Sequence, residues 1–276
     1  MWIDSAVESA VKRDRIVVLG ALSIVVVIAW AYVLAGAGMN MSAFEMTRMT
    51  SGNGGMDMMM PAVWDIGYAG LMFVMWWVMM IAMMLPSAAP AVLLFAALNR
   101  KRKEEGNPFV PTSLFASAYL AAWAGFSILA VALQWGLESA ALLSPMLISA
   151  SAGLGGMLLL AAGIYQLSPL KRACLKRCRS PLQFILAHWG SGASGAFRMG
   201  IEHGAYCVGC CWVLMGLLFF GGIMNLYWII GLAIFVLLEK TIPTGHRLGD
   251  LVGTALIVWG TAVLAGAQPL RFLGMA

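Results

Sequence analysis

The chain has 276 residues, of which 62% are apolar and 11% are charged, with a mean hydropathy of +0.88 and a net charge of +5. About a quarter of the residues of a soluble globular domain are charged, so this composition excludes such a domain. We therefore predict an integral membrane protein with an all-α fold, because hydrocarbon tolerates only a backbone that is hydrogen-bonded within itself.

Seven apolar stretches approach the roughly 20 residues that a membrane-spanning helix needs. The first, 16–35, is longer than the apolar core of about 7 to 15 residues found in a cleaved signal peptide, so we predict a membrane anchor. The second, 66–98, contains Pro86 and Pro90, which are expected to kink the helix and to end its span near Pro86. The other five are 114–133, 147–167, 205–220, 226–238 and 248–266.

The positions of lysine and arginine predict the orientation, because cytoplasmic loops carry an excess of both. With a cytosolic N-terminus, 15 of the 17 basic residues fall in cytosolic segments and only Arg48 and Arg271 fall outside. This pattern predicts a multi-pass protein of the bacterial inner (plasma) membrane. The positive charge suits anionic lipid, and no nucleic-acid partner is expected. The predicted parts of the single membrane domain 1–276 are a cytosolic N-terminus 1–15, a Met-rich outer loop 36–63 and a basic cytosolic loop 168–204.

Methionine is concentrated in the predicted outer loop and in the second helix. Eight methionines fall between Met39 and Met60, and thioethers are soft ligands that select Cu(I) and remain competent in an oxidising compartment. Four more in the second helix fall within an arc of about 80°, forming one stripe that would pass an ion across the membrane. Flexible packing by methionine explains the same pattern without a metal. The stripe consists of Met72, Met75, Met79 and Met83.

The segment IEHGAYCVGCCW marks the predicted cytosolic end of the fifth membrane helix. Its residues His203, Cys207 and Cys211 follow one another at four-residue steps, and Cys210 lies one turn from Cys207. Three or four ligands can therefore converge on one helix face, which predicts a metal site.

A second pair of thiols, Cys174 and Cys178, lies four residues apart in the basic loop. The neighbouring lysines and arginines favour thiolate over thiol. The five cysteines predict either two neighbouring sites or one shared site. Copper is the expected metal, and zinc is the alternative because Cys and His bind it well.

Two readings without a bound metal compete with this one. The spacing of Cys207 and Cys210 is that of dithiol oxidoreductases, so a membrane thiol oxidoreductase is one alternative. A structural or assembly protein whose sulfur atoms only pack is the other. Among the lone polar residues, Glu239 and Lys240 are explained by an ion pair or by snorkelling, and Asn225 by a helix cap or turn.

Several runs of sequence resemble a known bacterial family. They are YQLSPLKRACLKRCRSP, HGAYCVGCCWVLM, FGGIMNLYW, the closing LLEK and MIAMMLP. The chain is similar, from about Trp64 to Gly260, to predicted metal-binding integral membrane proteins, a domain of unknown function. By that resemblance the matched motif cysteines are Cys174, Cys178, Cys207, Cys210 and Cys211.

Together these patterns predict a membrane protein that binds a soft metal ion, copper, for uptake or for delivery to a partner metalloenzyme or metallochaperone. No ATP-binding element is evident, so inward movement would follow a gradient, and an enzymatic activity is not expected. One positive charge is worth about 2.3 kcal/mol per 100 mV of membrane potential, which favours entry of a cation.

Overall fold

The computed structural model describes residues 2–51, 63–104, 110–144, 147–149 and 151–266. Within these ranges the regular structure is helical, apart from one isolated bridge between Leu143 and Ser149. The predicted all-α class is therefore confirmed. The helices are α1 (Trp2–Leu34), α2 (Ala43–Ser51), α3 (Ile66–Glu104), α4 (Thr112–Ser139), α5 (Ala152–Leu167), α6 (Pro169–Arg179), α7 (Pro181–Ala187), α8 (Gly192–Gly216), α9 (Leu218–Gly221), α10 (Leu226–Thr241) and α11 (Gly245–Leu264).

Five segments of the described chain are long and apolar enough to cross a membrane, and a sixth results if α5 and α6 form one span bent by 63°. Seven spans were expected from the sequence. The stretch at 226–238 is α10, whose 16 residues are fewer than the roughly 20 that cross a bilayer. The five are 15–34 in α1, 66–102 in α3, 112–139 in α4, 192–221 in α8 with α9, and 245–264 in α11.

The loops predicted around the spans contain helices of their own. The outer loop includes α2, which begins with a capping box: the Ser42 backbone N–H and hydroxyl both donate to the Glu45 carboxylate at 2.8 Å. The basic loop consists of α6, α7 and the first half of α8. Asn225 caps α10 by accepting from the Tyr227 backbone N–H at 3.0 Å, as predicted.

Glycines allow several of these helices to pack closely. A Cβ added to Gly163 of α5 would lie 2.7 Å from the carbonyl oxygen of Gly253 in α11. A Cβ added to Gly200 of α8 would lie 2.4 Å from the carbonyl oxygen of Phe115 in α4. Small residues at such crossings let helix backbones approach in membrane proteins. The α5–α11 and α4–α8 pairs are therefore fixed by backbone contact.

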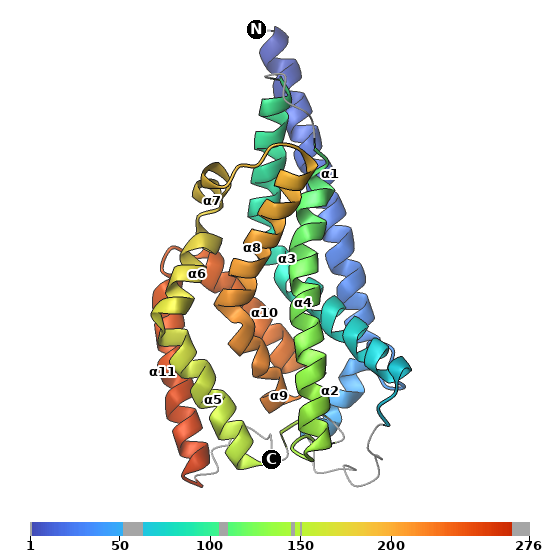
Figure 1. Cartoon of the computed structure of the whole chain (residues 1–276), viewed down its shortest axis with the longest axis vertical. Coiled ribbons are helices and arrows are strands. Elements are labelled where there is room, and N and C mark those ends of the chain that lie inside the picture. Colours follow the sequence, from blue (N-terminus) through green and yellow to red (C-terminus); the bar gives the residue numbers. More distant parts are fainter. Residues whose placement is uncertain (1, 52–62, 105–109, 145–146, 150, 267–276) are drawn as a thin grey trace.

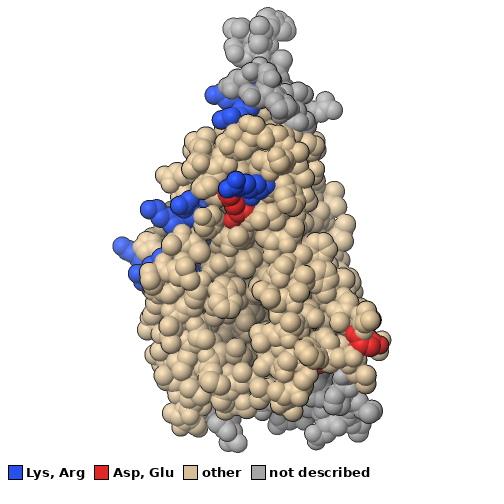
Figure 2. Space-filling model, viewed as in Figure 1, with Lys and Arg blue, Asp and Glu red and all other residues tan. Residues whose placement is uncertain are grey.

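The helices run between two ends of the molecule (Figure 1). α1 begins and α3 ends at the upper end, whereas α2 and α9 lie towards the lower end. Lys and Arg side chains are visible in the upper half of the face drawn in Figure 2. α3 continues as a helix through Pro86 and Pro90, and it changes direction along its course (Figure 1). The helix therefore continues past both prolines to Glu104, and the exit from the membrane near Pro86 stays a prediction.

Candidate metal centre

The three cysteines of α8 lie in the interior of the helix bundle. Cys207, Cys210 and Cys211 are each about 1% exposed. Their helix is held against α4 by the close crossing at Gly200, and a Cβ on Gly204 would likewise lie 3.1 Å from the carbonyl oxygen of Tyr119. The crossing brings the Tyr119 hydroxyl within 3.0 Å of the Cys207 Sγ. Glycine spacing thus sets the distance between the thiols and α4.

A buried ammonium group also contacts the Cys207 thiol. Lys240, near the end of α10, places its Nζ 2.9 Å from the Cys207 Sγ and 3.1 Å from the Ser87 Oγ. Lys240 is 9% exposed, so its side chain turns into the bundle and does not snorkel. Tyr119 of α4 and Lys240 of α10 therefore contact this one sulfur atom, and Ser87 of α3 contacts the ammonium.

The two cysteine groups of the sequence meet at α6. The Cys178 Sγ lies 4.0 Å from the Cys210 Sγ. Cys174 packs at the edge of the cluster, with its Sγ 3.0 Å from where a Cβ on Gly209 would stand. Both α6 cysteines are less buried as residues than the α8 cysteines, and Cys174 has the more open thiol. The structure therefore brings Cys178 to the α8 cysteines and leaves Cys174 beside the helix backbone.

The methionine stripe of α3 faces the protein interior. Met72, Met75, Met79 and Met83 are at most 1% exposed, so they are not lipid-facing residues. At about 1.5 Å of rise per residue, successive members are about 4.5–6 Å apart along the helix axis. At one end of the stripe, the Gln134 Nε2 donates to the Met72 Sδ at 3.3 Å.

The methionine that reaches the thiols lies to one side of the stripe. The Met84 Sδ is 3.9 Å from the Cys211 Sγ. In the predicted outer loop, Met46 is buried, Met39 and Met41 are half-buried, and Met49 is exposed. The other methionines of the predicted outer loop, Met56, Met58, Met59 and Met60, lie outside the described residues.

His203 lies one helical turn before Cys207 on α8. Its ring lies among aromatic rings, with centroids 5.3 Å from Phe184, 5.9 Å from Tyr119 and 6.1 Å from Phe115. The ring is buried, and its Nδ1 has no hydrogen-bond partner among the described residues. Aromatic side chains lie next to the His203 ring, and its role as a metal ligand stays a prediction.

The geometry of the sulfur atoms limits what the cluster can bind. Across the part of the chain that the structure describes, no group of three or more His, Cys, Asp or Glu side chains is arranged to hold a metal ion. Metal–sulfur bonds of about 2.3 Å at tetrahedral or trigonal angles place two sulfur ligands about 3.8–4.0 Å apart. The Cys178–Cys210 and Cys211–Met84 pairs have this separation. Two sulfur pairs, one with a thioether, suit a soft ion with few ligands.

Two groups at this centre were not foreseen from the sequence. Lys240 was assigned to a helix end, and Tyr119 was not singled out. Charged residues inside membrane helices are costly and are usually paired, which is the signal that points to Lys240. Tyr119 has no such signal, because an aromatic residue in an apolar helix is ordinary.

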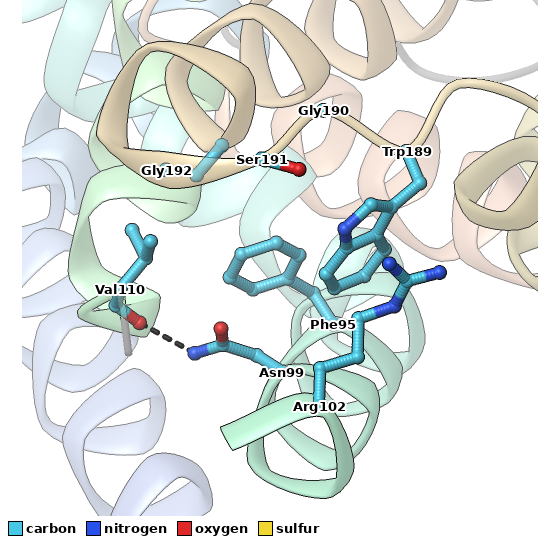
Figure 3. A pocket seen from close by; sticks show the side chains of 9 residues that line it. Phe95, Asn99, Arg102, Val110, Trp189, Gly190, Ser191 and Gly192 are labelled. Carbon is cyan, nitrogen blue, oxygen red and sulfur yellow. Dashed lines mark hydrogen bonds between the residues drawn. The ribbon is translucent and has the colours of Figure 1, made fainter. Parts of the chain in front are cut away.

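A separate pocket lies near the end of α3 and the start of α8 (Figure 3). The Asn99 Nδ2 donates to the Val110 carbonyl oxygen at 2.5 Å, and the Arg102 guanidinium lies 4.3 Å from the centroid of a Trp189 ring. The lining contains no cysteine, methionine or histidine. This pocket therefore lacks the donors that a soft metal prefers.

The sequence was compared with known proteins. A model of the PpoB2 copper chaperone family matches residues 73–263. The chain belongs to this copper chaperone family. The match covers nearly the same residues as the predicted resemblance, includes all five cysteines and begins just after Met72. Membership in a copper chaperone family confirms the prediction of a protein that binds and delivers copper. No curated protein and no solved structure matches the chain.

Proposed function

We propose that this PpoB2-family protein binds Cu(I) between sulfur pairs of the cluster, Cys210 of α8 with Cys178 of α6 and Cys211 with Met84, and delivers the ion to a copper-receiving partner protein. The observation that carries the proposal is the 4.0 Å approach of Cys178 to Cys210, which joins cysteines from two helices at a distance suited to metal ligands. Met84 adds a thioether 3.9 Å from Cys211. Sulfur donors of this kind favour Cu(I) over a hard cation.

The buried methionines of α3 supply a route towards these thiols. An ion that enters near Met72 would meet Met75, Met79 and Met83 in turn at steps of about 4.5–6 Å. With the basic residues on the cytosolic side of a bacterial inner membrane, the ion would move inward. Such movement follows the membrane potential, which contributes about 2.3 kcal/mol per 100 mV for one positive charge.

Copper is favoured over zinc by the ligands in the cluster. Structural zinc sites are almost always tetrahedral with four nitrogen or sulfur ligands from cysteine and histidine. His203, the only histidine in α8, is surrounded by aromatic rings. Cys207 is also engaged by the Lys240 ammonium at 2.9 Å, which reduces the negative charge available to a divalent ion. These features suit a monovalent soft cation.

The dithiol alternative is disfavoured by burial. Thiol–disulfide exchange requires a thiolate that a substrate disulfide can reach. Cys207 and Cys210 are each about 1% exposed, so a protein substrate would have to open the bundle before the sulfur atoms could react.

The test is Cu(I) titration of metal-free, detergent-solubilised protein in competition with a chromogenic chelator. We compare the wild type with a Cys207→Ser, Cys210→Ser, Cys211→Ser triple variant, and with Met157→Leu as a control because Met157 is exposed on α5. The wild type and the control should bind copper stoichiometrically, and the triple variant should lose it while keeping its helix content. Equal, negligible copper in all three would refute the proposal. A parallel zinc titration distinguishes the two metals.

A further inference from the structure

A buried ion pair connects the cysteine-bearing helix α6 to α10. The Lys171 Nζ lies 2.7 and 2.9 Å from the two carboxylate oxygens of Glu239. The two side chains are 1% and 2% exposed. Gln166 satisfies both charges, because its Nε2 donates to the Glu239 Oε1 at 2.7 Å and its carbonyl oxygen accepts from Lys171. A Cβ on Gly249 would lie 2.5 Å from the same Oε1, so α11 closes the other side of the network.

This network helps to fix the position of α6. Support from another helix is needed because α6 does not continue the axis of α5. The two helices meet at Ser168 with a bend of 63°. The hydrogen bonds of the α6 arginines are exposed: Arg172 pairs with Asp250 at 3.0 Å, and Arg179 donates to the carbonyl oxygens of Ile242 and Pro243. Leu175 of α6 also packs in the buried core, so the ion pair acts together with one apolar contact. Exposed ion pairs contribute little, whereas breaking a buried pair by removing one partner leaves an uncompensated charge.

The thiols of α6 differ from those of α8 in their access to solvent. Cys174 and Cys178 are partly exposed residues, and the Cys174 thiol is the more open of the two, whereas the α8 cysteines are fully buried. An acceptor protein therefore reaches the cluster first at α6. Cu(I) can move from a buried thiolate to Cys178 by ligand exchange, in which one copper–sulfur bond forms as another breaks and the oxidation state of copper does not change. This exchange needs Cys178 to remain close to Cys210.

We propose that the Glu239–Lys171 ion pair is a latch that holds α6 in register with α8, so that copper leaves the buried thiols through Cys178 and then Cys174. The inference rests on the proposed copper function and adds its exit route. Glu239 and Lys171 are positioning residues in this scheme, because neither side chain touches the metal ligands. Their effect on copper acts through the placement of α6.

The first test needs no metal. In the metal-free protein, Glu239→Gln keeps the size of the side chain but leaves the Lys171 charge uncompensated. We expect alkylation of Cys174 and Cys178 by a hydrophilic maleimide, located by peptide mass spectrometry, to accelerate on the order of tenfold. The alkylation rates of Cys207 and Cys211 should not change.

Two further variants separate a latch from general damage. Exchanging the charges, with Lys171→Glu and Glu239→Lys together, should restore the slow alkylation of the wild type. Arg172→Gln removes an exposed ion pair from the same helix and should have little effect. Unchanged rates in Glu239→Gln would overturn the latch, and so would a rise at all five cysteines, since that pattern reports unfolding.

The second readout is copper transfer. Protein loaded with Cu(I) is mixed with excess hydrophilic chelator. Glu239→Gln should still hold copper through Cys211 and Met84, but it should release the ion several-fold more slowly because Cys178 is no longer close to Cys210. Faster release would overturn the exit route. A wild type that takes up no copper would refute the proposed function alone, because the alkylation result on metal-free protein stands independently of it.

Discussion

Gly200→Ala perturbs the crossing that positions the α8 thiols. The new Cβ would lie 2.4 Å from the Phe115 carbonyl oxygen and 2.6 Å from the Ala118 Cβ, neither of which is the end of a flexible side chain. Ordinary van der Waals contact begins at 3.4 Å, so α4 and α8 must part by about 1 Å. Overpacking of this kind costs about 1–3 kcal/mol, partly offset by the better helix propensity of alanine, about 1 kcal/mol.

The same displacement reaches the metal centre. The Cys207 Sγ stands 3.0 Å from the Tyr119 hydroxyl across this crossing, and a shift of about 1 Å would lengthen that contact beyond hydrogen-bond range. We therefore expect lower thermal stability together with weaker Cu(I) binding in the chelator competition assay. Gly125→Ala is the matched control, because nothing lies within 4 Å of a Cβ added at that position of α4. Gly200→Ala protein with the stability and copper affinity of the control would refute the reasoning.

Two further predictions concern single side chains. Met84→Leu removes the thioether that lies 3.9 Å from Cys211 while nearly conserving the side-chain volume. The Cu(I) affinity should therefore fall about tenfold with little change in stability. A Cu(I) affinity equal to that of Met157→Leu would contradict the assignment of Met84 as a ligand. In α2, hydrogen bonds from the Ser42 hydroxyl and backbone N–H to the carboxylate hold the pKa of Glu45 below its ordinary value. A lowered pKa in the folded state means that the stabilisation is complete above the unfolded pKa and is lost as pH falls through the folded value. Hydrogen-exchange protection of the α2 amides should therefore decrease below about pH 4, and Glu45→Gln should show no such dependence.

Much of the outline of this protein could be predicted from the pattern of apolar residues. The stretches at 16–35, 66–98 and 114–133 correspond to α1, α3 and α4, because a run of apolar residues of sufficient length dictates a spanning helix wherever it occurs. The stretch at 226–238 is also a helix, α10, but with 16 residues it is shorter than a typical membrane span. The helix of α3 runs on through Pro86 and Pro90, because a proline removes one backbone hydrogen bond but does not stop a helix whose neighbours pack around it.

Sequence by itself determined the membrane character, the helices and the shared face of the α8 cysteines, because the helical period fixes the relative positions of residues within one helix. Only the tertiary structure decided that Cys178 meets Cys210, that Lys240 turns to Cys207 and that Glu239 pairs with Lys171. Each of these contacts joins different helices. Their distances depend on glycine crossings such as Gly200 and on the bend at Ser168, and hydrophobic periodicity does not encode how two helices cross.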